Sequence, residues 1–427
     1  MRATADEITE KRFHRKPGIL VTGGTGFLGS HLAVRLLQSG YRVYLLVRGR
    51  GKVSASQRVQ RLFEWFGVDP GDLKPIVIEG HLDHPQLGLG AAALDSLSGA
   101  VEEIVHCASD TSFSERKRPR VVKTNVCNFQ NLLHFASKSR CYFIHHISTA
   151  YVAGKNGSLC PETFVERGEF TNVYEETKQQ AEKLARRMCA ENGIRLNIYR
   201  PSIVYGHSRT GKTFRFNALY YPVRTLLFLR NLYERDIRES GGGRADAMGA
   251  RMDADGNVYL PIRIESACAG INLIPIDYFT EAFAAIMEEA LEGGVFHVVN
   301  PKSKSILDLV EYIQRFFRIR GISSVPRGAL SKMPKNGIES LFEQYIDAYG
   351  PYIRDERIFE NGKSAKILGK KNIRCPDFDY TVFESCMRYA VEAQWGANLF
   401  DREDAPYETE RPIPPKAGNI ERPTSHE

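Results

Sequence analysis

The sequence has 427 residues, of which 42% are hydrophobic and 26% are charged, and its formal net charge is +7. This length accommodates an α/β domain with a smaller second lobe, and the apolar share is typical of a globular protein with a sizeable core. The basic residues form no stripe interleaved with aromatics, which argues against a nucleic-acid partner, and the eight cysteines lack the paired spacing of a zinc site.

No part of the sequence has the pattern of a targeting or membrane-spanning segment. The first 16 residues are polar and contain no apolar core of signal-peptide length. No run of about eighteen apolar residues occurs, so we expect no helix that spans a membrane. Because the cysteines are scattered singly, as in proteins of a reducing compartment, we expect a cytoplasmic location.

Short apolar runs alternate with helical patterns through the first half of the chain. We expect strands at Gly18–Thr22, Arg42–Val47, Pro75–Glu79, Val101–His106, Tyr142–Ser148 and Arg195–Arg200. We expect helices at Ser30–Ser39, Asn125–Ser137 and Tyr174–Asn192. Such alternation predicts an α/β fold, a doubly wound parallel (Rossmann) sheet covered by helices on both faces.

A glycine-rich turn joins the first strand to the first helix. Its glycines have the spacing GxxGxxG, which lets the chain turn sharply, approach a pyrophosphate and pack the helix close to the strand. The helix N-terminus offers free N–H groups to the phosphates. We therefore expect a dinucleotide site that involves Thr22, Gly23, Gly26, Phe27, Leu28 and Gly29.

The end of the second strand predicts which dinucleotide binds. An NAD site places an acid there to hold the ribose hydroxyls. No Asp or Glu occurs between Ser30 and Arg61, and Arg48 stands where the acid would be, with Arg58 nearby. A guanidinium suits a 2′-phosphate, so the sequence favours NADPH.

A second motif lies at the expected distance downstream. Tyr174 and Lys178 form YxxxK on one helix face, where an ammonium can lower the pKa of a phenol. Thr149 follows a strand whose C-terminal end should face the ligand crevice, and its hydroxyl can bind a substrate oxygen while Tyr174 donates a proton. Ser148 competes with Thr149 for that role.

Three other polar residues receive different interpretations. Asn125 either orients a water or backbone group in a proton relay or simply caps its helix. His145 and His146 are adjacent on a strand and so face opposite sides, which favours structural roles for both. We expect no metal site.

The second half of the chain has a looser pattern. The predicted ranges are a polar N-terminal extension (1–16), an NADPH-binding domain (17–206), a mostly helical substrate-binding lobe (207–400) and an extended or disordered tail (401–427). Within the lobe we expect strands that return near 273–276 and 295–299, a helix at Ser305–Phe317 and mostly helices over 320–396. Residues 239–257 are rich in Gly, Asp and Arg and predict a mobile loop.

The motifs TGGTGFLGSHL, NVCNFQNLL, HISTAYVAG and YEETK resemble those of the extended short-chain dehydrogenases/reductases. VHCASDTSF, RPSIVYGHSRTGK, NLIPIDYFTEAF and VFHVVNPKSKSILDLVEYI resemble a narrower branch, the thioester reductases and fatty acyl-CoA reductases of the male-sterility type. The resemblance covers residues 18 to 315.

The resemblance implies an oxidoreductase that transfers hydride from NADPH to an acyl thioester and yields an aldehyde, which some members reduce further to an alcohol. Thr149, Tyr174 and Lys178 would form the catalytic triad. The glycines would hold the pyrophosphate, and Arg48 the 2′-phosphate. The remaining cofactor contacts would come from Arg58, Ala108 and Lys178, and from the backbone of Pro201, Ser202 and Ile203, which would meet the nicotinamide carboxamide.

One family contact is altered. The family has Gly-Asp-Leu after the third strand, with the Asp on the adenine, whereas this chain has Gly80-His81-Leu82. His81 and Leu82 thus become the candidates at the adenine. The chain shows no adenylation or carrier segment, so we expect coenzyme A or an acyl or peptidyl carrier protein to deliver the thioester.

Two other functions fit parts of the sequence. A sugar-nucleotide epimerase or dehydratase, or a hydroxysteroid-type dehydrogenase, would share the fold, but sugar enzymes usually have an acid where Arg48 stands. A non-catalytic NADPH-sensing protein would also keep the fold, but such proteins typically lose the Tyr or the Lys of YxxxK.

Overall fold

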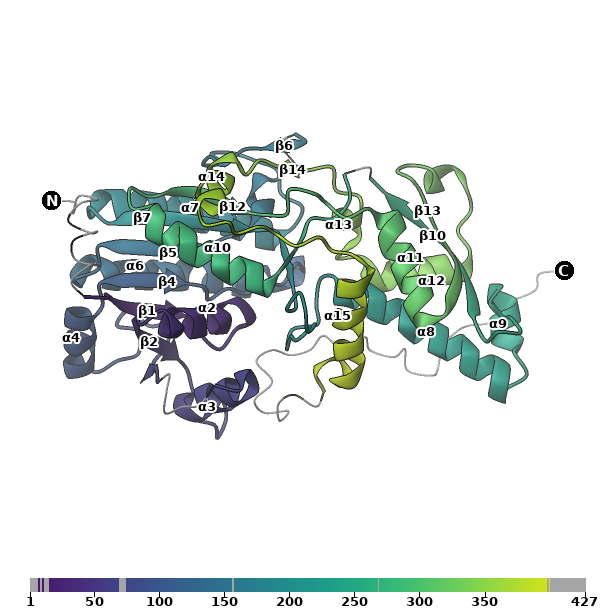
Figure 1. The fold of residues 1–427 in the computed structure, drawn as a ribbon, viewed down its shortest axis with the longest axis horizontal. Coiled ribbons are helices and arrows are strands. Elements are labelled where there is room, and N and C mark those ends of the chain that lie inside the picture. The colour runs from purple at the N-terminus through teal and green to yellow at the C-terminus, as the bar shows by residue number, and fades with distance from the viewer. Residues whose placement is uncertain are drawn as a thin grey trace.

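The computed structural model describes residues 15–397 except 69–73, 156 and 268, together with residues 7, 10 and 399. Most of the predicted N-terminal extension and the whole predicted tail lie outside these residues. The described chain has a parallel sheet with its helices at one end and a smaller lobe at the other (Figure 1). Among the described residues, no helix combines the length and the apolar character needed to cross a membrane.

The main sheet has seven strands, all parallel, in the order β12-β7-β5-β4-β1-β2-β3. The strands are β1 (Gly18–Thr22), β2 (Arg42–Val47), β3 (Ile76–Glu79), β4 (Glu103–His106), β5 (Phe143–Ile147), β7 (Arg195–Pro201) and β12 (Gly294–Val298). The order reverses at β1, which lies between β2 and β4. The predicted doubly wound sheet is therefore confirmed, and its switch point lies where β1 ends.

Successive side chains of each strand pack into two separate cores, one on each face of the sheet, because strand residues alternate between faces. Ile19 and Val21 pack on one face, and Leu20 packs on the other. The first face is covered by α2 (Phe27–Gln38), α3 (Ala55–Phe66), α10 (Ile276–Glu289) and α14 (Gly362–Lys370). The second face is covered by α4 (Ala91–Ala100), α6 (Asn128–Lys138) and α7 (Val173–Glu191).

The predicted lobe of residues 207–400 is not one body in space. Strand β12 pairs with β7, and α10 and α14 pack on the main sheet, because their apolar faces join its first core. A third core, apart from the two on the faces of the main sheet, belongs mainly to the remaining helices and strands. These are α8 (Tyr220–Glu239), α9 (Gly243–Met248), β9 (Arg251–Met252), β10 (Val258–Ser266), α11 (Ile306–Phe317), β13 (Ile319–Pro326), α12 (Gly337–Ile346), α13 (Gly350–Ile353) and α15 (Tyr380–Glu392).

The lobe contains strands that the sequence did not predict. β10 and β13 run parallel, and β9 joins β10 to complete a three-stranded sheet, although residues after 320 were expected to be mostly helical. The predicted mobile loop of residues 239–257 contains α9 and β9. The Asp236 carboxylate accepts hydrogen bonds from the Arg244 and Ala245 amides at 3.0 Å each and so fixes the start of α9.

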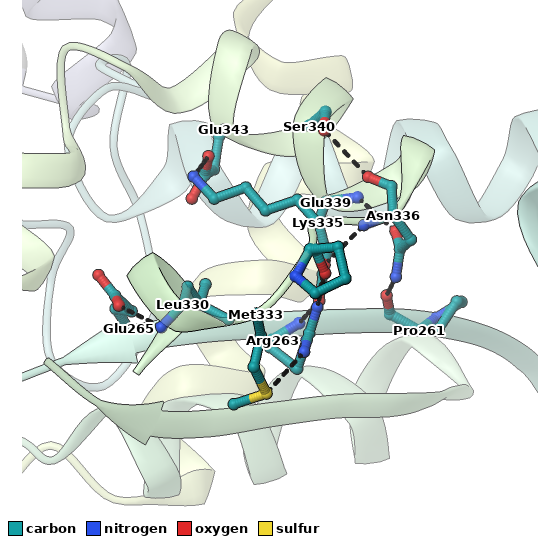
Figure 2. A network of polar contacts seen from close by, with 11 residues as sticks. Pro261, Arg263, Glu265, Leu330, Met333, Lys335, Asn336, Glu339, Ser340 and Glu343 are labelled. Atoms are coloured by element: carbon teal, nitrogen blue, oxygen red, sulfur yellow. Dashed lines mark hydrogen bonds and ion pairs between the residues drawn. The ribbon is translucent and has the colours of Figure 1, made fainter. Parts of the chain in front are cut away.

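A polar network fastens α12 to β10 (Figure 2). Arg263 on β10 forms a forked ion pair with the buried carboxylate of Glu339, at 2.6 Å from Nε and 2.7 Å from Nη2. Glu339 and Asn336 also form a capping box at the first turn of α12. The Asn336 amide donates to the Pro261 carbonyl on the same strand. Every group of this network belongs to the lobe.

Short elements complete the described chain. Two two-stranded pairs connect distant segments: β11 (Leu273–Pro275) with β8 (Ile203–Tyr205), and β14 (Ile358–Phe359) with β6 (Leu159–Cys160). The single-turn elements are η1 (Glu115–Lys117), α5 (Arg118–Val122), η2 (Lys123–Cys127), η3 (Ala150–Ala153), η4 (Leu330–Lys332) and η5 (Gln394–Gly396).

Candidate functional site

The glycine-rich turn leaves no room for side chains. Gly23 has φ +71°, and a Cβ there would lie 2.6 Å from the Ala108 amide nitrogen. A Cβ on Gly29 would lie 2.3 Å from the Gly23 carbonyl oxygen. Helix α2 begins after Gly26, which has no side chain to cap the first N–H groups of the helix. A tight backbone cradle at a helix N-terminus is what a pyrophosphate requires, so these residues fit a dinucleotide.

The side chains around this turn point into the protein. The Thr22 hydroxyl is buried and lies 2.8 Å from His106 Nδ1. The Phe27 ring packs edge-on against Phe214, with centroids 5.6 Å apart, and Leu28 packs against the first core. The residues predicted to contact the dinucleotide can therefore do so mainly through their backbone.

Arg58 connects the end of β2 to the glycine-rich turn. Its Nη1 donates to the Arg48 carbonyl at 2.8 Å, and its Nη2 donates to the Thr25 hydroxyl at 3.3 Å. The Arg48 side chain is exposed directly after β2. The Arg58 guanidinium thus lies beside the turn and Arg48 directly follows β2, so both arginines are candidates for a 2′-phosphate site.

The fold also brings an acid to this place, although the local sequence contains none. Glu79 ends β3 and pairs in register with Val47, the last residue of β2. Its carboxylate accepts from the Ala55 amide at 3.2 Å and so caps the start of α3. A Cβ on Gly49 would lie 2.9 Å from Glu79 Oε1. The segment from Ser30 to Arg61 therefore contains no acid itself, but the neighbouring strand β3 brings the Glu79 carboxylate to the end of β2.

The candidates for the adenine lie just past β3. The His81 side chain is exposed, and its amide donates to the Leu87 carbonyl at 2.7 Å. The Leu82 carbonyl accepts from the Asn131 amide group at 2.9 Å. The other predicted contact in this part of the chain, Ala108, lies directly against Gly23. Of these three candidates, Ala108 is therefore the one that the described contacts place beside Gly23.

Thr149, Tyr174 and Lys178 come together where β5 ends. Thr149 begins η3, and its hydroxyl accepts from the Tyr151 amide at 3.3 Å and forms a hydrogen bond with the Tyr174 phenol. Lys178 is buried, and its Nζ donates to the Ile147 carbonyl, the last of β5, at 2.6 Å. The structure therefore gathers the predicted triad at the carboxyl end of a central parallel strand.

Burial sets the charges of these groups. It raises the pKa of the Tyr174 phenol above its usual value, while the hydrogen bond from Thr149 and the charge of Arg215 act in the opposite direction. Burial also lowers the pKa of Lys178 to about 8. The net shift of the Tyr174 pKa is thus upward, opposite to the lowering expected from the YxxxK spacing, because desolvation outweighs the contributions that lower it. At neutral pH Tyr174 carries a proton that it can donate.

Several buried side-chain atoms have no hydrogen-bond partner among the described residues, and two of them are serine hydroxyls. They belong to Ser148, which precedes Thr149, and to Ser202, which lies between β7 and β8. Ser202 is flanked by Pro201, which is buried at the end of β7, and by Ile203, whose amide donates to the Asn272 carbonyl. A buried polar atom without a partner is costly, so Ser202 fits a residue that would hold the nicotinamide carboxamide.

Asn125 does not cap a helix. The predicted helix begins earlier, at Arg118, and passes through the π-helical turn η2, which contains Asn125. The buried Asn125 amide accepts from the Ser109 hydroxyl and the Asp110 amide, and donates to the Asp110 carbonyl and the Thr177 hydroxyl. Asn125 therefore fixes the loop after β4 to α7, next to Tyr174.

The two neighbouring histidines face opposite sides of the sheet, as predicted. His145 lies 2.9 Å from the Tyr199 hydroxyl and 3.2 Å from a Glu103 carboxylate oxygen. His146 stacks on Phe129 in the other core. In the part of the chain that the structure describes, no three His, Cys, Asp or Glu side chains form a group suited to a metal ion.

Several residues near Tyr174 were missed by the sequence reasoning. Arg215 donates to the Thr111 hydroxyl at 3.1 Å and is close enough for its charge to act on Tyr174. The Phe113 ring lies 5.9 Å from the Tyr174 ring and stacks on Tyr352 of α13 at 5.2 Å. Phe113 and Arg215 lie in or just after motifs that the sequence singled out, but no spacing rule assigns them to the site.

Comparison with known proteins places the chain in a family. The sequence matches the model of the family described as male sterility protein over residues 21–282, which is more than half of the chain. The chain belongs to this family. Both the glycine-rich turn and the YxxxK pair lie within the matched range.

Two proteins with established names are similar to this chain in sequence. One component of the linear gramicidin synthase of Brevibacillus parabrevis is 24% identical over 390 residues, which cover 87% of this chain and 7% of that protein. Fatty acyl-CoA reductase 1 of Xenopus laevis is 28% identical over 231 residues, which cover 45% of this chain and 44% of that protein. The match thus spans less than half the length of each relative.

Solved structures share the fold of this family member. The terminal R domain from the myxalamid PKS-NRPS pathway has a TM-score of 0.67 and 22% identity, with coverage of 89% of this chain and 92% of that domain. UDP-glucuronic acid 4-epimerase from Bacillus cereus, in complex with NAD, has a TM-score of 0.59 and 17% identity, with coverage of 89% and 98%. Both similarities support the extended Rossmann fold.

Proposed function

We propose that this chain is an NADPH-dependent reductase of acyl thioesters that releases an aldehyde. The observation that carries the proposal is the hydrogen-bonded pair of Thr149 and Tyr174, with Lys178 beside it, at the end of β5. The pair lies in a fold whose glycine-rich turn fits a dinucleotide, in a chain whose relatives include a fatty acyl-CoA reductase.

The cofactor, when bound, supplies a hydride to the thioester carbonyl carbon. In this proposal Thr149 and Tyr174 donate hydrogen bonds to the carbonyl oxygen, where negative charge develops as the hydride arrives. Tyr174 then transfers its proton to that oxygen. The resulting hemithioacetal breaks its C–S bond, so that the products are an aldehyde and a free thiol. Lys178 holds the cofactor ribose and returns a proton to Tyr174.

The preference for NADPH rests on Arg48 and Arg58. Arg48 directly follows β2, and Arg58, which lies on α3, is fixed by its bonds to the Arg48 carbonyl and Thr25. Glu79 opposes this preference, because a carboxylate near a 2′-phosphate is repulsive. Since its oxygen accepts from the Ala55 amide, we propose that Glu79 serves to cap α3 and that the arginines decide the specificity.

We further propose that the thioester reaches the site on coenzyme A or on a carrier protein, and that the lobe binds the acyl group. The match to a component of linear gramicidin synthase over 87% of this chain supports a carrier, and the match to a fatty acyl-CoA reductase supports coenzyme A. The Phe113 ring lies next to Tyr174 and stacks on Tyr352, and both of these rings would contact the acyl group.

The decisive experiment supplies the purified chain with NADPH and a panel of acyl-CoA and carrier-bound acyl thioesters and follows NADPH absorbance. We expect oxidation of NADPH and release of a free thiol. The ratio of NADPH consumed to thiol released distinguishes an aldehyde product from an alcohol. No oxidation with any thioester, together with turnover of a sugar nucleotide, would assign the chain to the epimerase-like alternative.

A further inference from the structure

Arg357 lies between α13 and β14 and binds several groups at once. It is 8% exposed. Its Nη1 donates to the carbonyls of Tyr151 and Gly154 at 3.3 and 3.4 Å. The guanidinium also pairs with Glu175, at 3.3 Å from Nη2, and with Asp355, at 2.8 Å. One side chain from the C-terminal part of the chain thus has partners in three separate segments.

Two of these segments carry the candidate catalytic pair. The carbonyls of Tyr151 and Gly154 belong to the turn that begins at Thr149. Glu175 directly follows Tyr174 in the first turn of α7. Arg357 therefore holds the backbone on which Thr149 lies and the helix end on which Tyr174 lies. The hydrogen bond between Thr149 and Tyr174 spans the two elements that this guanidinium joins.

The surroundings hold the guanidinium in place. Glu175 is fully buried, and its second carboxylate oxygen accepts from the Thr171 amide at 2.9 Å. The Tyr151 ring lies under the guanidinium, with its centroid 4.7 Å away, and the Tyr352 ring lies 6.0 Å away. Buried ion pairs contribute little to stability, because desolvation offsets their attraction. A role in positioning accounts for this cluster better than a role in stability.

The lobe contains a second cluster of the same design. Asn336 caps α12, Glu339 lies in its first turn, and Arg263 binds that carboxylate (Figure 2). At α7, Asn172 and Glu175 occupy the same positions of the first turn. The partners differ: Arg263 also reaches Met333 and Pro334, which lie within the lobe, whereas Arg357 reaches the turn after Thr149.

We propose that Arg357 is a positioning residue that sets the geometry of Thr149 and Tyr174 and couples it to the lobe. This inference rests on the proposed function for its kinetic readout. Since α13 precedes Arg357 and carries Tyr352 against Phe113, the same segment reaches both the catalytic pair and the aromatic rings beside it. An acyl group held by these rings is thereby kept at a fixed position relative to the proton donor, Tyr174.

The test compares Arg357→Met, Arg357→Lys and Glu175→Gln with the matched control Arg263→Met. We expect Arg357→Met to lower kcat for thioester reduction about 100-fold while the KM for NADPH changes little, because small displacements of reacting groups are costly. Arg357→Lys keeps a cation and should recover part of kcat. The kcat of Glu175→Gln should lie between those of the wild type and Arg357→Met. Arg263→Met should keep the wild-type kcat.

Amide hydrogen exchange provides a readout that needs no turnover. Arg357→Met should speed exchange at residues 150–154 and 173–176, whereas Arg263→Met should speed it only around α12. If both variants change kcat equally, or if exchange at 150–154 is unchanged in Arg357→Met, the proposal is wrong. Failure of the wild-type protein to reduce thioesters would overturn the proposed function, while the exchange data would still decide the role of Arg357.

Discussion

The hydroxyl of Thr149 is hydrogen-bonded to the phenol of Tyr174, and this contact joins the turn after β5 to the first turn of α7. The Tyr151 amide donates to the same threonine oxygen and fixes its orientation. Because burial raises the pKa of Tyr174, the phenol keeps its proton at neutral pH. The pair thus presents two hydroxyl donors side by side, as the stabilisation of a developing oxyanion requires.

Removal of the phenolic hydroxyl should stop the reaction without loss of the cofactor. In Tyr174→Phe we expect kcat to fall by about 10²–10⁴-fold, the usual contribution of a general acid. The Kd for NADPH, measured by fluorescence titration, should stay within about threefold of wild type, since in the proposed site Tyr174 acts on the substrate. A fully active Tyr174→Phe would remove Tyr174 from the chemistry.

The two adjacent hydroxyls of Thr149 and Ser148 should differ in importance. Thr149→Val retains the side-chain shape and loses the bond to Tyr174, so kcat should fall by about 10²-fold, as for other oxyanion donors. Thr149→Ser should restore most of the activity. Ser148→Ala removes a buried hydroxyl without a partner among the described residues and should leave kcat close to wild type. A larger loss in Ser148→Ala than in Thr149→Val would reverse the assignment.

Lys178 should give the reaction an alkaline limit. Its pKa of about 8 makes it a cation below that pH and neutral above it. If the cation holds the ribose and protonates Tyr174, kcat/KM should fall about tenfold per pH unit above pH 8. Tyr174 itself stays protonated in this range because its pKa is raised. In Lys178→Arg the charge persists at all these pH values, so the fall in kcat/KM above pH 8 should disappear even if the rate is lower. If the same fall in kcat/KM persists in Lys178→Arg, the titrating group is not Lys178.

The sequence predicted the parts of the fold that follow from local patterns. Alternating apolar runs located all seven strands of the main sheet, and the glycine spacing located the turn between β1 and α2. β10 and β13 were missed because their burial depends on each other and on α8 and α12, which are distant in sequence. Arg215 and Arg357 were missed for the same reason: their partners are more than a hundred residues away.

Charge was the least predictable property of the site. Along the chain, Arg48 stands in a run without acids, but the parallel pairing of β2 with β3 brings Glu79 to the same edge. Similarly, the i, i+4 spacing of Tyr174 and Lys178 suggested a lowered phenol pKa, whereas burial determines the actual direction. Both outcomes depend on tertiary contacts that no single motif contains.

The competition between Arg48 and Glu79 can be measured. Arg48→Glu should weaken NADPH binding by about tenfold or more, because a charged hydrogen bond to the 2′-phosphate is lost, and should leave NADH binding nearly unchanged. Glu79→Gln keeps an acceptor for the Ala55 amide and removes the negative charge, so NADPH should bind more tightly. Equal weakening of both cofactors in Arg48→Glu would exclude Arg48 from phosphate recognition.

Steric exclusion at the glycine-rich turn can be separated from backbone strain. Gly23 and Gly40 both have positive φ, at +71° and +79°, but a Cβ on Gly23 would meet Ala108 at 2.6 Å, whereas a Cβ on Gly40 would meet nothing within 4 Å. Gly40→Ala should lower the free energy of unfolding by only about 1–2 kcal/mol, the cost of holding an alanine in the left-handed conformation, and should keep NADPH affinity. Gly23→Ala should cost more and weaken NADPH at least about tenfold, because the β1–α2 backbone must shift away from the pyrophosphate position. Equal NADPH affinity in the two variants, measured by the same titration, would show that the close approach of Gly23 to Ala108 does not shape the dinucleotide site.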